Sequence, residues 1–347
     1  MPVRERRHRM VVPSREPAGL GMGNPRDMIR VERLTKRYGP LKAVDRVSFE
    51  VGRGEIVGLL GPNGAGKTTT MRMLTTFLPP TSGRATLAGH DVLDEPLEVR
   101  KRVGYLPESV PLYPEMRVRE YLTFRAKLKD VPRGRRRAAI DGVIERCRLQ
   151  DVERRVLGHL SKGYRQRVGL AESMVHDPDI LILDEPTAGL DPIQIREVRA
   201  LIRELGDRHT ILLSTHIMSE VEAVCGRLII IARGRIAEDA PLERLGDEGV
   251  IVIEARGPAD EMLAALRSAP GVEQVRLSGR EDGYAAFEVR ARGGADLREA
   301  LGRRLAEGGW PLRRLDLSRV TLEERFIQAV ARADVAAGAD ADQREAV

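Results

Sequence analysis

The chain has 347 residues, 42% of them hydrophobic, and its 58 basic and 52 acidic side chains give a formal net charge of +6. That length predicts about two domains, and so mild a charge excess favours solvated arginine-rich faces over a nucleic-acid surface. Two cysteines, Cys147 and Cys225, lie far apart without histidine-bearing ligand spacing, which predicts buried, reduced thiols rather than a metal site.

The first 27 residues are basic, rich in glycine and proline, and lack apolar periodicity. They predict a disordered extension at 1–27. The apolar stretch at 10–12 is too short for a signal peptide, and Met1 and Met28 are both candidate starts. Further along, no charge-free apolar run approaches the roughly 20 residues of a membrane helix, so we expect no membrane span.

Residues 55–60 read as a buried strand, and 61–68, "GPNGAGKT", match the phosphate-loop pattern G-x-x-x-x-G-K-[ST]. A helix is predicted next, with Met71, Leu74 and Phe77 on one side. Strand, glycine loop and helix together form the structural context that this motif requires. The sequence therefore predicts a phosphate site at 61–68.

The residue types in this loop suit a nucleoside triphosphate with its metal ion. Glycines let the backbone curl so that successive N–H groups face phosphate oxygens. Lys67 adds a positive charge near the β- and γ-phosphates, and the Thr68 hydroxyl suits Mg²⁺, which prefers oxygen ligands.

Residues 109–160 show helical periodicity in two segments joined by "VPRGRRR" at 131–137, which we interpret as a basic turn. Its arginines face either anionic lipid headgroups or only solvent.

The stretch "HLSKGYRQR" at 159–167 predicts a helix start with Ser161 as its N-cap. A helix start leaves backbone N–H groups free and carries the positive end of the helix dipole, so it favours an anion. Nothing adjacent in the sequence supplies one.

Ile180–Leu183 is a continuous apolar run, typical of a parallel strand covered on both faces. It ends in two carboxylates, which we expect beside the phosphate loop. Asp184 is placed to hold the Mg²⁺ shell. Glu185 points elsewhere and is placed to orient and polarise the attacking water.

Residues 211–213 predict a neighbouring buried strand, and His216 follows its end. A histidine there is placed to donate to the γ-phosphate and to sense its presence. Glu185 and His216 are thus the predicted catalytic pair.

From residue 246 the pattern changes to β-α-β-β-α-β, which predicts a small ferredoxin-like unit. Thr321 and Glu324 then form a capping box for a last helix. We expect a frayed end after it and see no catalytic constellation here.

Together these motifs resemble the nucleotide-binding subunit of an ATP-binding cassette (ABC) transporter over residues 29 to about 240. The resemblance implies that Tyr38 stacks on adenine. It also implies an ATP-binding loop made of these residues: Gly61, Pro62, Asn63, Gly64, Ala65, Gly66, Lys67, Thr68 and Thr69.

Two positions depart from the usual family pattern. The Leu-Ser-Gly-Gly-Gln signature is here Leu-Ser-Lys-Gly-Tyr at 160–164, and the expected glutamine is Glu108. As a carboxylate, Glu108 is still able to ligate Mg²⁺ with Thr68 and Asp184. Both departures resemble the cassettes that drive ABC-2-type export permeases.

In this family the signature helix binds the γ-phosphate held by a second subunit. The resemblance therefore implies a dimer around two ATP molecules, either a homodimer or a pair with another ATPase subunit. Asp191 lies in the loop that reaches across that dimer. The implied signature contacts are Ser161, Lys162, Gly163 and Tyr164.

The resemblance implies an ATPase with ATP and Mg²⁺ as cofactors. It would act peripherally on the cytoplasmic face of the cell membrane, power export through a separate transmembrane permease, and bind no nucleic acid. One alternative is a soluble non-transport ABC ATPase of the translation or DNA-repair type, although such chains usually carry two cassettes or long heptad arms. The other is a regulatory nucleotide switch that does not hydrolyse.

The predicted fold class is an α/β P-loop NTPase cassette with a small C-terminal α+β ferredoxin-like domain. The cassette, at 28–245, has a parallel RecA-like core, an antiparallel β flap near 31–51 and an α-helical subdomain at about 109–175. The C-terminal accessory domain with its final helix covers 246–333, and 334–347 form a flexible tail.

Overall fold

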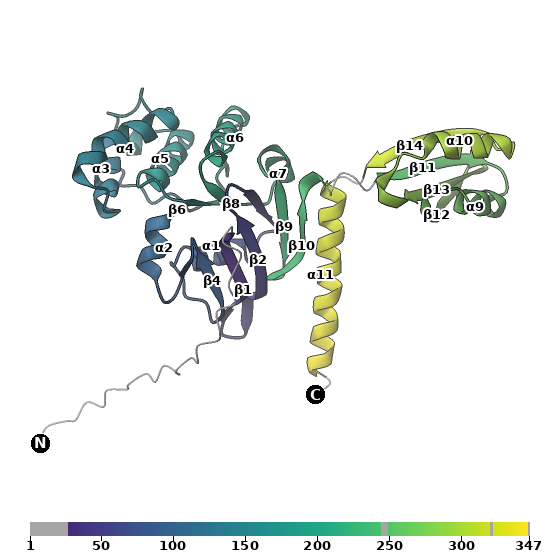
Figure 1. The fold of residues 1–347 in the computed structure, drawn as a ribbon, viewed down its shortest axis with the longest axis horizontal. Helices are drawn as coiled ribbons and strands as arrows, with labels where there is room; N and C mark the ends of the chain where they lie inside the picture. Colours follow the sequence, from purple (N-terminus) through teal and green to yellow (C-terminus); the bar gives the residue numbers. More distant parts are fainter. Residues whose placement is uncertain (1–26, 244–248, 320–321, 346–347) are drawn as a thin grey trace, which may run out of the picture.

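The computed structural model describes residues 27–243, 249–319 and 322–345. Three sheets organise these residues (Figure 1). Residues 1–26 of the predicted disordered extension at 1–27, the cap residue Thr321 and the last two residues lie outside the described part of the chain, whereas Asp27 begins the first strand.

The first sheet is antiparallel, with strand order β2-β1-β4-β5. It contains the predicted flap near 31–51. Its strands are β1 Asp27–Tyr38, β2 Leu41–Gly52, β4 Ser82–Leu87 and β5 His90–Asp91.

The central sheet has the order β10-β9-β3-β8-β7-β6, parallel except for β10 at one edge. Strand β7 is buried along its whole length, as the apolar run at 180–183 predicted. The strands are β3 Ile56–Leu60, β6 Val103–Leu106, β7 Ile180–Asp184, β8 Thr210–Thr215, β9 Arg227–Ala232 and β10 Arg235–Pro241.

Four helices accompany the central sheet: α1 Lys67–Leu74, α2 Pro96–Arg102, α6 Pro192–Gly206 and α7 Met218–Val224. Helix α1 is shorter than predicted. Met71 and Leu74 are buried, but Phe77 lies beyond the helix end and its side chain is 74% exposed. The chain turns at Thr76, whose φ of 60° is incompatible with a continued helix.

Residues 118–174 form a helical region that packs through α3, α4 and α5. Its elements are α3 Val118–Leu128, α4 Arg133–Arg146, the 3₁₀ turn η1 Leu157–His159 and α5 Lys162–Met174. The interpretation of 131–137 as a basic turn is wrong, because α4 begins at Arg133. Pro132 at the N-cap needs no N–H donor there, and its fixed φ suits a helix start.

The C-terminal sheet is antiparallel with the order β12-β13-β11-β14, and it has its own core around Phe287, Ile251 and Leu301. The observed β-α-β-β-α-β order is the predicted ferredoxin-like one. The elements are β11 Gly249–Arg256, α9 Ala259–Arg267, β12 Val272–Glu281, β13 Tyr284–Ala291, η2 Arg292–Gly294, α10 Arg298–Glu307 and β14 Leu312–Arg319.

The last helix, α11 Leu322–Glu345, contacts β9 and β10 of the central sheet. Leu322 and Ala329 are buried in the same apolar core as the helical region, and Arg325 forms an ion pair with Glu238 at 3.4 Å. The helix also continues through most of the predicted flexible tail at 334–347, because that segment is rich in alanine, the strongest helix former.

Candidate functional site

The glycine loop at 61–66 connects β3 to α1 and is shaped by close backbone packing. A Cβ on Gly61 would lie 2.3 Å from the Ile231 carbonyl oxygen, and one on Gly66 would lie 2.5 Å from that of Ala43. Gly64 and Gly66 also have φ values of 80° and 107°, which favour glycine. No side chain caps the start of α1, so its N–H groups are available to an anion.

Lys67, the first residue of α1, is 5% exposed, and its ammonium group lies inside this loop. The Nζ atom donates to the Gly61 carbonyl at 2.7 Å and lies 3.5 Å from Glu185 Oε1. A bound phosphate would compete with these partners for the same charge.

Thr68 and Asp184 meet across the gap between α1 and the end of β7. Thr68 Oγ1 donates to Asp184 Oδ1 at 3.2 Å, and Ser214 Oγ donates to the same oxygen at 2.6 Å. Burial raises the pKa of Asp184, although these two hydrogen bonds oppose the shift. A hydroxyl beside a carboxylate is an oxygen donor set that fits a hard divalent cation.

Strands β7 and β8 are neighbours, as predicted, and Glu185 and His216 face each other from their ends. Glu185 Oε2 lies 2.9 Å from His216 Nδ1. The Glu185 backbone has a φ of 48°, and its N–H donates to Ser214 Oγ at 3.1 Å. Positive φ is costly for glutamate, and such strain is concentrated at functional sites.

Sequence reasoning missed a buried network behind this pair. Glu220, on α7, is 3% exposed, and it accepts hydrogen bonds from Thr215 Oγ1 at 2.6 Å and from Thr187 Oγ1. One carboxylate thereby ties the residue before His216 to the loop that follows Glu185. The available signal was an acidic residue in the first turn of α7, which has no specific meaning until the two loops are brought together.

The predicted cap at the start of α5 is present. Ser161 Oγ accepts from the Tyr164 N–H at 3.4 Å, and the Tyr164 hydroxyl donates to Asp151 at 2.5 Å. The Lys162 ammonium packs against Gly189, and Gly163 packs against the Gln194 side chain. Within one chain this helix start therefore adjoins the 186–191 loop and the start of α6.

Asp191 in that loop caps α6, since its carboxylate accepts from the N–H groups of Ile193 and Gln194 at 3.0 and 2.9 Å. Its role at a dimer contact stays a prediction. Tyr38 ends β1 with 47% of its surface exposed, and the Lys36 ammonium lies 5.4 Å from its ring centroid.

Glu108 is exposed just after β6, and its negative charge contributes to the raised pKa of Asp184. Across residues 27–243, 249–319 and 322–345, no group of three or more histidine, cysteine or carboxylate side chains is arranged to hold a metal ion. A cation would therefore need oxygen ligands from the bound phosphates and from water. In the same ranges no helix is both long and apolar enough to span a membrane.

Comparisons with known proteins identify relatives over most of this chain. The family model described as ABC transporter matches residues 44–188. The bacitracin transport ATP-binding protein BcrA of Bacillus licheniformis is 33% identical, covering 87% of this chain and 97% of BcrA. The Nod factor export ATP-binding protein I of Ralstonia nicotianae is 41% identical, covering 76% and 83%. A solved structure of an ABC transporter ATP-binding subunit is 30% identical, with a TM-score of 0.58, covering 63% and 91%.

Proposed function

The chain belongs to the ABC transporter ATP-binding family, and from that premise we propose that it binds and hydrolyses ATP to power export through a separate transmembrane permease. The observation that carries the proposal is the convergence of Lys67, the Thr68–Asp184 pair and the Glu185–His216 pair at one edge of the central sheet.

ATP binding would rest on the glycine loop and Lys67. The free N–H groups of the loop and of the α1 start would receive the β- and γ-phosphates. Lys67 would exchange its contact with the Gly61 carbonyl for a phosphate oxygen. Tyr38, exposed at the end of β1, would offer its ring face to adenine.

Mg²⁺ would be held by Thr68 and Asp184, with Glu108 as a further oxygen ligand. When bound, the ion would neutralise charge on the phosphates. The hydroxyl and the carboxylate already lie 3.2 Å apart, so little rearrangement would be needed. A cation would also favour the ionised form of Asp184 against the effect of its burial.

Glu185 would orient and polarise the attacking water. Its carboxylate is held on both sides, by Lys67 at 3.5 Å and by His216 at 2.9 Å. His216 would donate to the γ-phosphate. The network at Glu220 would position both loops, because it joins Thr215 to Thr187.

A second ATPase subunit would complete each site. The capped α5 start, with Ser161, Lys162, Gly163 and Tyr164, favours an anion. Within the chain it lies beside the 186–191 loop, α6 and Asp151. We infer that the anion is the γ-phosphate on the partner subunit, which is either a second copy or a related chain. Hydrolysis would then release the contact, a two-state closure driven by ATP.

The proposed permease partner is of the ABC-2 type, and the chain would attach peripherally to it at the cytoplasmic face of the membrane. The relatives are named for bacitracin transport and Nod factor export, which supports transport over translation, DNA repair or a non-hydrolysing switch.

Purification from native membranes tests this function. We expect a polytopic membrane protein to co-purify and ATP turnover to require Mg²⁺. We also expect Lys67→Ala to abolish turnover. A chain that purifies alone from membranes and never self-associates with trapped ATP would contradict the proposal.

A further inference from the structure

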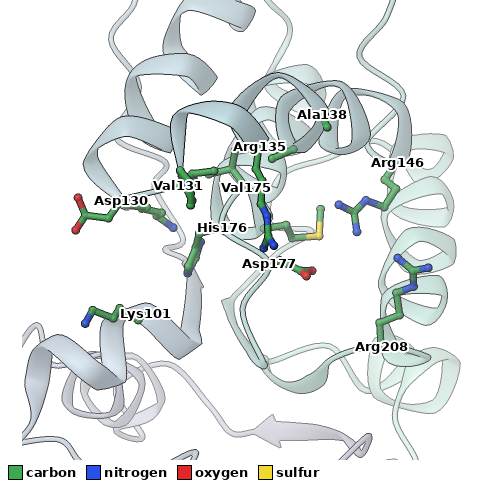
Figure 2. A pocket seen from close by; sticks show the side chains of 14 residues that line it. Lys101, Asp130, Val131, Arg135, Ala138, Arg146, Val175, His176, Asp177 and Arg208 are labelled. Atoms are coloured by element: carbon green, nitrogen blue, oxygen red, sulfur yellow. The ribbon is translucent and has the colours of Figure 1, made fainter.

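A cavity of about 600 Å³ lies between the helical region and the central sheet, apart from the site above (Figure 2). Its lining comes from the ends of α2 and α5, the turn between α3 and α4, the two ends of α4, and the turn before β8. These residues adjoin the amino ends of the parallel strands, whereas the glycine loop follows the carboxyl end of β3. The cavity therefore needs its own explanation.

The lining is strongly cationic. Five lysine and arginine side chains face two aspartates, Asp130 and Asp177. Two of the five have carboxylate partners outside the cavity: Lys101 pairs with Glu98 at 2.6 Å, and Lys129 pairs with Glu172 at 3.2 Å.

The other three cations are Arg135, Arg146 and Arg208. None of the three forms an ion pair with a carboxylate among the described residues. Arg146 Nε donates only to the Gly142 carbonyl oxygen of its own helix, at 3.2 Å. The three arginines come from two ends of α4 and from the turn after α6, and Figure 2 shows their guanidinium groups directed toward the same space. Gathering three like charges there is unfavourable unless an anion compensates them.

The start of α4 adds to the excess of positive charge at this cavity. Pro132 supplies no side-chain cap, and the first turn contains arginines and no acidic residue. Cations at the positive end of a helix dipole are normally avoided. This arrangement favours a negative group at the same mouth of the cavity, because Val131, Pro132 and Arg135 line it.

His176 supplies a further unsatisfied group in the lining. Its Nε2 lies 3.2 Å from the Val103 carbonyl oxygen, which makes Nε2 the donor. Its buried Nδ1 has no hydrogen-bond partner within the described residues, so it is left to accept from a ligand hydroxyl. The wall beside it is apolar, formed by Met174, Val175 and Val131.

We propose that this cavity binds a phosphate ester with an apolar portion, the phosphate contacting Arg135, Arg146 and Arg208. One guanidinium group is able to donate two parallel hydrogen bonds to the oxygens of a phosphate. The volume of the cavity falls within the range of small-molecule sites. A phosphate of this kind has two sources, a free organic phosphate ester and the headgroup of an anionic lipid, and inorganic phosphate serves as a probe of the arginine end alone.

The test uses the full chain with saturating ADP, which occupies the glycine loop. Two probes are titrated at constant ionic strength: inorganic phosphate by calorimetry, and vesicles of phosphatidylglycerol against vesicles of phosphatidylcholine by flotation. The triple variant Arg135→Gln, Arg146→Gln, Arg208→Gln should bind at least tenfold more weakly than the parent. The matched control Arg276→Gln, Arg280→Gln, Arg290→Gln removes the same charge from the C-terminal domain and should bind as the parent does.

Saturable phosphate binding lost only in the cavity variant supports a free phosphate. Vesicle binding that requires phosphatidylglycerol and the same arginines supports a lipid. Equal loss of binding in both triple variants, or no binding of either probe, overturns the proposal. If the triple variant does not fold, Arg208→Gln and Arg208→Lys replace it, with a weaker effect expected for lysine. Because basal ATP turnover is measured separately, failure here leaves the proposed function intact.

Discussion

Replacing Glu185 by glutamine isolates the chemical contribution of one carboxylate. The side chain is 9% exposed and held by Lys67 and His216, and glutamine has the same size and keeps an oxygen and a nitrogen in those two directions. The substitution therefore removes charge and basicity while leaving the packing in place.

We expect turnover to fall by about 10²–10³, or roughly 3–4 kcal/mol of barrier, the usual size of a positioned catalytic charge. ATP affinity should be retained, because Lys67 loses a competing anion at 3.5 Å. With binding intact and hydrolysis slow, an ATP-bound dimer should accumulate.

The assay combines steady-state phosphate release with size-exclusion chromatography in Mg-ATP. Glu185→Asp is the matched control, since it keeps the charge but withdraws the carboxylate by one methylene, and it should lie between the parent and the glutamine variant. Turnover of Glu185→Gln within threefold of the parent at saturating ATP would refute the assigned role.

Three further predictions follow from described contacts. Ser161→Ala should cost about 1 kcal/mol of unfolding free energy and raise the ATP concentration for half-maximal turnover. Ser161→Thr keeps the cap and serves as the control. Equal urea midpoints for the parent and both variants would contradict the capping role. Glu220→Ala should cost about 1–3 kcal/mol of unfolding free energy, because the Thr187 and Thr215 hydroxyls lose their acceptor. Turnover should fall more than ATP affinity, which a purely structural role would not predict. Glu220→Gln should restore part of the turnover. Burial lowers the pKa of His176 from 6.5 to about 3. Below pH 6.5 the unfolded chain therefore binds a proton that the folded chain excludes, and the free energy of unfolding falls as the pH drops. At pH 5 the loss is about 2 kcal/mol. His176→Gln should lose about that much less between pH 7.5 and 5 in urea unfolding, and identical losses would rule out a neutral buried histidine.

The fold and most of the site follow from short-range signals. Glycine spacing at 61–66, the apolar run ending at Asp184 and the cap at Ser161 are local features, each with a meaning independent of distant residues. The C-terminal order was equally readable, because strand and helix periods differ. The prediction was wrong where turn formation and helix initiation competed in one segment. At Arg133 a basic segment that contains proline begins a helix rather than a turn.

Several decisive features depend on which distant residues meet. Lys67 pairs with Glu185 across 118 positions of sequence, and Glu220 joins two loops. Helix α11 follows the C-terminal sheet in the chain but contacts β9 and β10 of the central sheet. The three arginines of the cavity come from separate turns and become a cluster only when α4 packs near the end of α6. Sequence alone determined the chemistry available to this protein, because residue type and local backbone preference are properties of short segments. Packing decided which of those groups share a charge environment, because electrostatic pairing depends on distance in space.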